Sequence, residues 1–279
     1  MWLIRLFGNG LGFIAYHLVK SRRNVGIINL TLCFPDMSLE EKQSIIKQHF
    51  KDLASSALEY SKMFYASAST IKNIVQLKNF EYVEKYYKKQ PIILVCPHFV
   101  GLDLGALRIT LEIGGYSIYS KQKSEYLTNI IKNARQRFNK LNGGQIFSRQ
   151  EGLRNIVKEM KKTKLPLFYL PDQDFGLQDS IFVPFFAQPT CATITTLPKL
   201  ARLTNAIIIP MATHRHGNHY EVEFFPPWAE YPSDNIEQDV IRMNSFVEAS
   251  IKPALSQYFW LHKRFKTQPD GRHKLYSRT

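Results

Sequence analysis

The chain has 279 residues, of which 44% are hydrophobic, enough for one α/β domain with a packed core. Lysine and arginine number 37 against 23 acidic residues, and the net charge of +14 favours anionic partners such as phosphorylated substrates, acidic proteins, nucleic acid or an anionic membrane surface. Three widely spaced cysteines exclude a disulfide framework and a paired-cysteine metal motif. The sequence has no Walker loop, GxGxxG motif or GxSxG elbow, which argues against nucleotide-dependent and serine-hydrolase chemistry.

The first nineteen residues are largely apolar with one charge, Arg5, and a basic cluster follows at residues 20–23. A secretory signal would carry its positive charge before the apolar stretch. The stretch is short and glycine-rich for a spanning helix, which needs about 20 apolar residues, whereas its aromatic side chains and the basic cluster suit an anionic membrane surface. We therefore expect residues 1–23 to form a membrane anchor or interfacial helix with a basic flank, preceding a domain over residues 24–279. A buried core helix is the alternative.

Helices and strands are predicted to alternate along the rest of the chain. Ser38 and Glu41 form a capping box that opens a helix, and apolar residues keep helical spacing from there to about Phe64. Strands are predicted over residues 92–96, 117–119, 145–147, 165–170, 207–209 and 221–225. Further helices are predicted over residues 79–88, 104–113, 126–141, 152–161, 192–204 and 236–258. This alternation predicts an α/β fold, a single domain with a largely parallel central sheet flanked by helices.

A histidine and an aspartate follow the predicted strand 92–96, with His98 at its carboxyl end and Asp103 five residues further on. Open α/β sheets bind ligands at the carboxyl ends of their strands. On one ideal helix, residues five apart point about 140° away from each other. If His98 lies in the turn and Asp103 in the first helical turns, with Gly101 easing the bend, the two side chains can meet. The carboxylate would then hold one ring nitrogen and leave the other as a general base, against the alternative of a structural pair.

Two further strand-to-helix turns contain candidate binding residues. Asp172 and Asp174 follow the strand 165–170, where they either bind nearby backbone amides or shape a ligand loop beside His98. Because no third ligand is nearby, we do not expect them to bind a metal ion. Arg149 is either an exposed loop residue or a phosphate contact, since its guanidinium offers forked donors.

Three other segments have a composition that invites a functional interpretation. The histidines of residues 214–219 are predicted to flank a hairpin turn, because no cysteine or carboxylate joins them at a zinc-site spacing. Residues 181–186 are too apolar for a surface loop, and we expect core packing or the lining of an acyl channel. Residues 260–266 mix aromatic and cationic side chains, which suits membrane contact or a nucleic-acid patch.

Several sequence blocks in combination resemble the late acyltransferases of lipid A biosynthesis, within the lysophospholipid acyltransferase superfamily. PHFVGLD looks like the superfamily motif of a histidine and an acid separated by four residues. CFPDMSLEEK, YLPDQDFG, IFVPFFAQPTCATIT and WLHKRFKTQPDG are similar to blocks of the lipid A enzymes. The similarity runs from about Leu30 to Gly271. Many lipid A enzymes carry glutamate where this chain has Asp103, and either acid can orient an imidazole.

The resemblance implies an O-acyltransferase that moves a fatty acyl chain from an acyl carrier protein thioester to a hydroxyl of a Kdo-bearing lipid A precursor, in lipopolysaccharide biosynthesis at the cytoplasmic face of the inner membrane. His98 would be the general base and Asp103 its orienting acid, with Arg149, Asp172 and Asp174 as substrate-binding candidates. No cofactor and no metal are expected. The partners would be the acyl carrier protein, a phosphorylated glycolipid acceptor and the anionic membrane surface, and not nucleic acid. The alternatives are an acyltransferase for a lysophospholipid or other glycolipid, and a non-enzymatic basic protein that binds membrane surfaces or nucleic acid.

Overall fold

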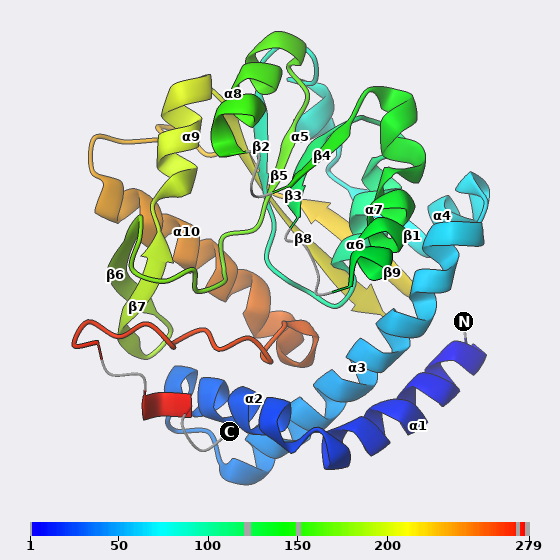
Figure 1. The fold of residues 1–279 in the computed structure, drawn as a ribbon, viewed down its shortest axis with the longest axis vertical. Coiled ribbons are helices and arrows are strands. Elements are labelled where there is room, and N and C mark those ends of the chain that lie inside the picture. Colours follow the sequence, from blue (N-terminus) through cyan, green and yellow to red (C-terminus); the bar gives the residue numbers. More distant parts are fainter. Residues whose placement is uncertain (1, 120–123, 149–151, 272–273, 277–279) are drawn as a thin grey trace.

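A seven-stranded sheet organises the fold in the computed structural model of the chain, which describes residues 2–119, 124–148, 152–271 and 274–276 (Figure 1). Its strands are β1 (Val75–Lys78), β2 (Ile92–Val95), β3 (Tyr116–Tyr119), β4 (Gln145–Ser148), β5 (Leu167–Tyr169), β8 (Ile207–His216) and β9 (His219–Phe224). The strand order is β1-β9-β8-β2-β5-β3-β4, in which β8 and β9 form an antiparallel hairpin and the other neighbours run parallel. The strands β6 (Ser180–Phe185) and β7 (Gln188–Ile194) form a separate antiparallel hairpin. The predicted α/β domain with a largely parallel sheet is confirmed.

Helices cover both faces of this sheet (Figure 1). They are α1 (Trp2–Leu18), α2 (Lys20–Cys33), α3 (Leu39–Tyr65), α4 (Ala68–Ile74), α5 (Glu81–Glu84), α6 (Leu102–Ile109), α7 (Glu125–Asn139), α8 (Gly152–Thr163), α9 (Thr196–Thr204) and α10 (Ile236–Ile251), with 3-10 turns η1 (Lys140–Asn142), η3 (Lys252–Gln257) and η4 (Lys274–Tyr276). The central strand β2 is fully buried, as expected for a strand covered on both faces. Ile92 and Leu94 join the core formed with α3 and α6, whereas Ile93 and Val95 point to the core beneath α8, α9 and α10.

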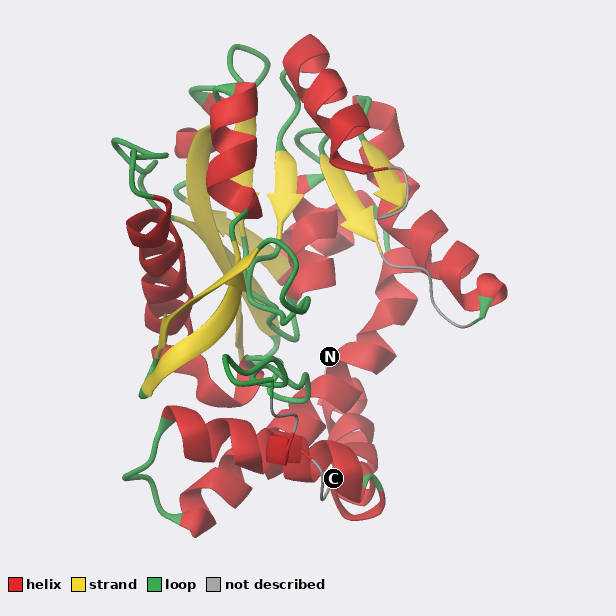
Figure 2. Cartoon of the chain, turned by 60° about the vertical axis from the view of Figure 1, so that its left-hand side comes forward, coloured by secondary structure: helices red, strands yellow, loops and turns green. Residues whose placement is uncertain are grey.

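The amino-terminal helix α1 lies along α3, in a helical layer at the bottom of Figures 1 and 2. The contact is close because glycines face α3: a Cβ at Gly8 would approach the backbone of Ser55 to 2.7 Å, and one at Gly12 the backbone of Lys51 to 2.4 Å. The other side of α1 exposes its large apolar side chains, Leu3, Leu6, Phe7, Leu11, Phe13, Ile14 and Leu18. This exposure contradicts the alternative of a buried core helix. Among the described helices, none combines the length and the apolar character needed to cross a bilayer.

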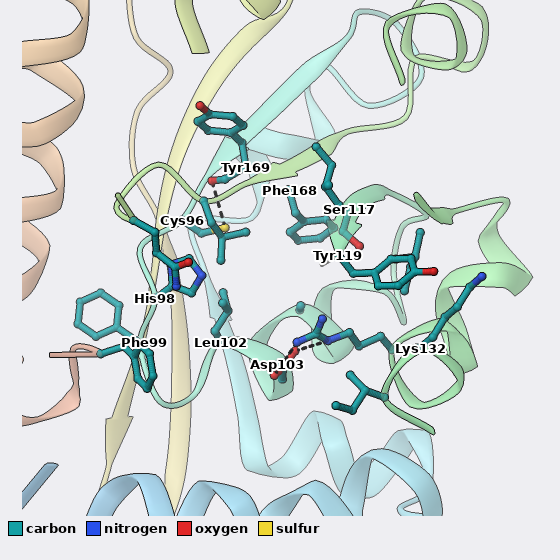
Figure 3. A pocket seen from close by; sticks show the side chains of 18 of the residues that line it. Cys96, His98, Phe99, Leu102, Asp103, Ser117, Tyr119, Lys132, Phe168 and Tyr169 are labelled. Carbon is teal, nitrogen blue, oxygen red and sulfur yellow. Dashed lines mark hydrogen bonds and ion pairs between the residues drawn. The ribbon is translucent and has the colours of Figure 1, made fainter. Parts of the chain in front are cut away.

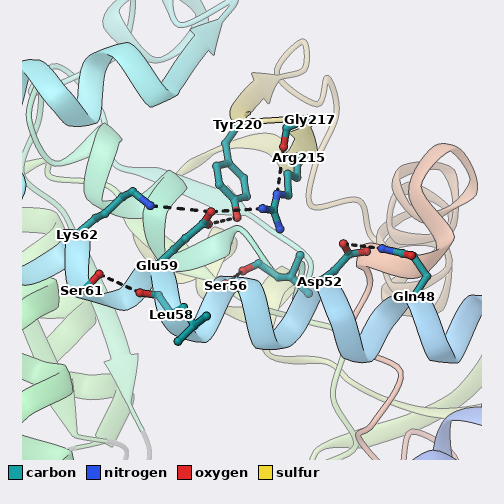
Figure 4. A network of polar contacts seen from close by, with 11 residues as sticks. Gln48, Asp52, Ser56, Leu58, Glu59, Ser61, Lys62, Arg215, Gly217 and Tyr220 are labelled. Atoms are coloured by element: carbon teal, nitrogen blue, oxygen red, sulfur yellow. Dashed lines mark hydrogen bonds and ion pairs between the residues drawn. The ribbon is translucent and has the colours of Figure 1, made fainter. Parts of the chain in front are cut away.

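The helix α3 is fixed to the β8–β9 hairpin by a buried ionic network (Figure 4). The fully buried Glu59 accepts hydrogen bonds from the Tyr220 hydroxyl and from Arg215 Nη2, the latter at 3.3 Å. One helical turn earlier, Ser56 donates to the backbone carbonyl of Val100, in the turn that follows β2. The network therefore sets the position of α3 relative to the sheet and to the end of its central strand.

Most predicted elements are present, and three of the helices differ clearly from their predicted bounds. The helix expected over 192–204 begins at Thr196, because residues 188–194 form β7. The helix expected over 79–88 is reduced to the single turn α5, because Asn79 and Lys88 adopt left-handed backbone conformations that interrupt a helix. The helix expected over 236–258 ends at Ile251 and continues as the turn η3, where Pro253 lacks the backbone donor. The sequence analysis missed α2, α4, β1, β6 and β7, and α2 runs across the expected boundary at residue 23.

Two segments with suggestive composition belong to the core. Residues 181–186 fall in β6 and the turn after it, where Val183 and Phe185 are buried. Trp260 and Arg264, expected at a membrane or nucleic-acid surface, are also buried. Arg264 donates to the carbonyl of Ala192 at 2.6 Å, so it fastens the carboxyl-terminal segment to β7. The outward role expected for Arg264 is therefore wrong.

Candidate active site

The turn after β2 is held by the carboxyl-terminal segment of the chain. The backbone N–H of Val100 donates to the carbonyl of Gln257, and the N–H of Phe259 donates to the carbonyl of His98, both at 2.9 Å. These bonds pair backbone N–H and C=O groups that lie beyond the end of the strand and would otherwise have no hydrogen-bond partner. They fix the backbone of His98 at the carboxyl end of the central strand.

His98 is paired with Asp172, which lies in the turn after β5. Its Nδ1 lies 2.7 Å from Asp172 Oδ1, and its backbone N–H donates to Oδ2 at 2.9 Å. Burial raises the pKa of the Asp172 carboxyl. The hydrogen bonds from His98, and the positive charge that His98 carries when protonated, lower this pKa by a larger amount, so the net pKa lies below its usual value. An ionised carboxylate only accepts, so Nδ1 carries the proton. When the ring is neutral its lone pair is therefore on Nε2, and the His98 side chain, 25% exposed, lines a cavity.

Asp103 makes a different contact from the one expected. Its carboxylate accepts hydrogen bonds from Arg135 Nε at 2.7 Å, from Arg135 Nη2 at 3.2 Å and from the Tyr60 hydroxyl. In Figure 3 the labelled side chains of His98 and Asp103 lie apart, and the dashed contacts of Asp103 do not run to the imidazole. The start of α6 turns Asp103 toward α7 and α3, where a planar guanidinium offers two parallel donors. The structure therefore pairs His98 Nδ1 with Asp172 and not with Asp103.

Asp174, expected to shape a ligand site, braces the loop that contains Asp172. It accepts from the backbone N–H and the hydroxyl of Thr267, each at 2.8 Å, and from the N–H of Gly176 at 2.9 Å. Its own N–H donates to His262 Nε2 at 3.0 Å. Burial, together with nearby cations, lowers the pKa of His262 to about 4, so this ring is neutral and can accept. Asp172 and Asp174 are both buried and neither lines the cavity, so their contacts hold the loop.

A cavity of about 840 Å³ lies beside His98 and extends from α3 to α8 (Figure 3). Much of its wall is apolar, formed by Leu102, Ile118, Ile131, Ile146, Ile156 and Phe168. Asp103, Arg135 and Lys132 supply charged groups to the same wall. Its volume is in the range typical of small-ligand sites. The arrangement places the His98 imidazole at the edge of a cavity that suits a long apolar group with a polar end.

Two predictions about binding residues have different outcomes. Arg149 lies outside the described residues, so its expected phosphate contact stays a prediction. The histidines of the 214–219 segment flank the β8–β9 turn, as predicted. Within the described ranges, no group of three or more histidine, cysteine or acidic side chains is arranged to hold a metal ion.

Arg135 and Tyr60 were not anticipated from the sequence. Arg135 is one of several cations in the helix predicted over residues 126–141, and Tyr60 is one of several aromatic residues in α3. Their partner Asp103 is distant in the chain from both, and no local spacing links the three positions. Only the packing of α3, α6 and α7 brings them together.

Comparisons with known proteins identify the family of this chain. Residues 2–267 match the family described as bacterial lipid A biosynthesis acyltransferase. The lipid A biosynthesis lauroyltransferase of Escherichia coli is 32% identical over 96% of this chain and 87% of its own length. A lipid A biosynthesis acyltransferase of Haemophilus influenzae is 33% identical over 96% of this chain and 86% of its own.

A solved structure of the 1-acyl-sn-glycerophosphate acyltransferase of Thermotoga maritima aligns with 91% of this chain and 95% of its own, at 13% identity and a TM-score of 0.42. The assignment therefore rests on the sequence matches, which span nearly the whole chain and include the turns that contain His98 and Asp172. The chain belongs to the family of bacterial lipid A biosynthesis acyltransferases.

Proposed function

We propose that this acyltransferase moves a fatty acyl chain from an acyl carrier protein thioester to a hydroxyl of a Kdo-bearing lipid A precursor. Membership of the family makes the chain an enzyme of lipid A biosynthesis, so the non-enzymatic alternative is wrong. The observation that supports the chemistry best is the His98–Asp172 pair, which leaves one imidazole nitrogen for a substrate at the cavity. No cofactor or metal ion enters this proposal.

His98 acts as the general base. Nε2 takes the proton of the acceptor hydroxyl while the oxygen forms a bond to the thioester carbonyl carbon. The carbon–sulfur bond then breaks, and the imidazolium returns its proton to the leaving thiolate. Cys96 also lines the cavity, but burial raises the pKa of its thiol well above the usual value, which disfavours a thiolate nucleophile. Direct transfer without an acyl-enzyme therefore fits these residues best.

Two carboxylates divide the supporting roles in this proposal. Asp172 holds the productive tautomer of His98 and stabilises the imidazolium as it forms. Asp103, bound to Arg135 and Tyr60, acts as a positioning residue on the cavity wall. The apolar side of the cavity takes the acyl chain, and the cationic side chains face the phosphorylated acceptor.

The exposed apolar side of α1 supports action at the cytoplasmic face of the inner membrane. A helix of 17 residues is about 25 Å long, shorter than the roughly 30 Å hydrocarbon core, so we propose that α1 lies in the interface. Lys20 is exposed next to it and suits anionic headgroups.

The test is acyl transfer from purified acyl carrier protein thioester to a Kdo-bearing lipid A precursor, with products identified by mass spectrometry. We expect His98→Ala to lower kcat about 10²–10⁴-fold while the circular dichroism spectrum is unchanged. Near-normal turnover by the folded variant would refute the mechanism. Transfer to a lysophospholipid or another glycolipid, but not to the lipid A precursor, would refute the acceptor.

A further inference from the structure

The helix α8 carries a stripe of four exposed cations, Arg154, Lys158, Lys161 and Lys162, here called the α8 basic stripe. At 100° per residue these positions fall within about 100° of the helix surface. The opposite side of α8 is buried through Ile156 and Met160. The one acid of this helix, Glu159, is half-buried.

The stability of the helix does not explain the whole stripe. Lys161 and Lys162 lie in the last turn, where cations are favourable, but Arg154 lies in the first turn, where a positive charge opposes the helix dipole. Some other surface lysines have an acidic partner, as in the Lys72–Glu112 ion pair at 2.8 Å. Within the part of the chain that the structure describes, no acidic side chain pairs with the α8 basic stripe.

The stripe begins at the cavity, and its helix lies at the end of the molecule opposite the proposed membrane side. Leu153, the neighbour of Arg154, lines the cavity and is 40% exposed, so the amino-terminal end of α8 forms part of its rim. In Figure 1, α8 lies at the top of the molecule, whereas α1 and α2 lie at the bottom, and the turn to Figure 2 keeps these heights. A partner bound along the stripe would therefore reach the cavity without displacing α1 from a lipid surface.

We infer that the α8 basic stripe is the docking surface for the acidic carrier that bears the acyl thioester. This inference rests on the proposed function, since it names where the proposed donor binds. Unpaired cations beside a substrate entrance attract an acidic protein over long range and orient it as it approaches. The carrier would lie along α8, with its acyl thioester passing over Leu153 toward His98.

The experiment compares two donors that share one acyl chain, a carrier protein thioester and a small acyl pantetheine thioester. We expect the variant Arg154→Glu with Lys158→Glu to raise the ratio of the two KM values, carrier over small donor, roughly ten- to a hundredfold at low salt. Added salt should shrink the difference between variant and wild type. The matched control is Lys88→Glu with Lys89→Glu, a pair of exposed lysines outside α8, which should keep the wild-type ratio.

The outcomes separate this inference from the proposed function. If the wild-type enzyme uses the small thioester but not the carrier thioester, the proposed donor is wrong and the docking surface is wrong with it. If the wild-type enzyme uses the carrier and the α8 variant keeps the wild-type KM ratio, the docking surface alone is wrong. Loss of flotation with phosphatidylglycerol-containing vesicles at an unchanged KM ratio would assign the stripe to the membrane and overturn the inference.

Discussion

The pairing of His98 with Asp172, in place of Asp103, gives the sharpest test of the site. In Asp172→Asn the side chain has one acceptor oxygen and an amide that donates, whereas His98 presents two donors, its backbone N–H and Nδ1–H. If the oxygen keeps the backbone bond, the amide faces Nδ1 and favours the tautomer with its proton on Nε2. That tautomer cannot accept a proton from the acceptor hydroxyl.

The size of the effect follows from the two contacts. A hydrogen bond to a charged group contributes about 1.5–3 kcal/mol, and Asp172 is only 3% exposed, so water cannot replace the lost bond. Together with the loss of the base tautomer, we expect kcat to fall about 10²–10⁴-fold, the full contribution of general base catalysis. Asp103→Asn perturbs a site whose side chain is 22% exposed and does not touch His98, so it should leave the His98 tautomer unchanged.

The assay pairs turnover with nitrogen-15 NMR of labelled histidine, in which His98→Ala identifies the His98 signals. We expect the Nδ1–H signal to be present in wild type and in Asp103→Asn, and absent in Asp172→Asn. The reasoning is refuted if Asp172→Asn keeps wild-type kcat and tautomer, or if Asp103→Asn is the variant that loses the Nδ1–H signal.

The same carboxyl makes a prediction about acid stability. Because its folded pKa lies below the ordinary value of 3.8, Asp172 contributes stability above that pH and loses it as the pH falls through the folded pKa. Asp172→Asn should therefore show a weaker loss of stability than wild type below about pH 4, measured by thermal unfolding. An identical acid profile for the two proteins would contradict the lowered pKa.

Four further predictions concern the surrounding structure. Arg135→Gln should lower kcat/KM roughly tenfold in steady-state kinetics, since it removes a partly exposed pair worth about 1–2 kcal/mol, and a wild-type value would contradict its positioning role. Glu59→Gln should lower the free energy of unfolding by about 3–5 kcal/mol in urea titrations, because Arg215 stays buried without its charge partner, and a change below 1 kcal/mol would contradict this. Phe7→Glu with Leu11→Glu should reduce flotation with anionic vesicles while transfer to detergent-dispersed acceptor persists, and unchanged flotation would contradict the interfacial role of α1. Exhaustive chelation should leave turnover intact, and a loss that one metal restores would contradict the proposed chemistry.

The sequence was informative where the signal is local. The capping box of Ser38 and Glu41 is present as predicted, and the apolar run before His98 forms the buried central strand. Gly101 was expected to ease the bend between His98 and Asp103, but the structure gives a different reason for a glycine there. Its backbone conformation is ordinary, with φ −89°, and a Cβ there would lie 2.5 Å from the Tyr220 ring. The sequence pattern drew attention to Gly101, but the reason for a glycine there is the packing of β9 against the turn.

The partner of His98 was not predictable in the same way. Asp103 is near in sequence and Asp172 is not, and spacing alone favours the nearer acid. The pairing of the adjacent strands β2 and β5 determines which acid contacts His98. Because Val95 pairs with Tyr169 in parallel, the turn after β2 and the turn after β5 lie at the same edge of the sheet. Both turns had been expected at strand ends, but the order of strands in the sheet could not be deduced from the sequence.

The carboxyl-terminal segment connects the two halves of the His98–Asp172 pair. Gln257 and Phe259 bind the turn that contains His98, and Thr267 binds Asp174 in the loop that contains Asp172. The basic, aromatic residues 260–266, which composition assigned to outside partners, lie between these contacts, and His262 among them accepts from the backbone N–H of Asp174. Since hydrogen-bond geometry at a general base must hold to fractions of an ångström, weak packing in this segment should impair turnover before it unfolds the domain.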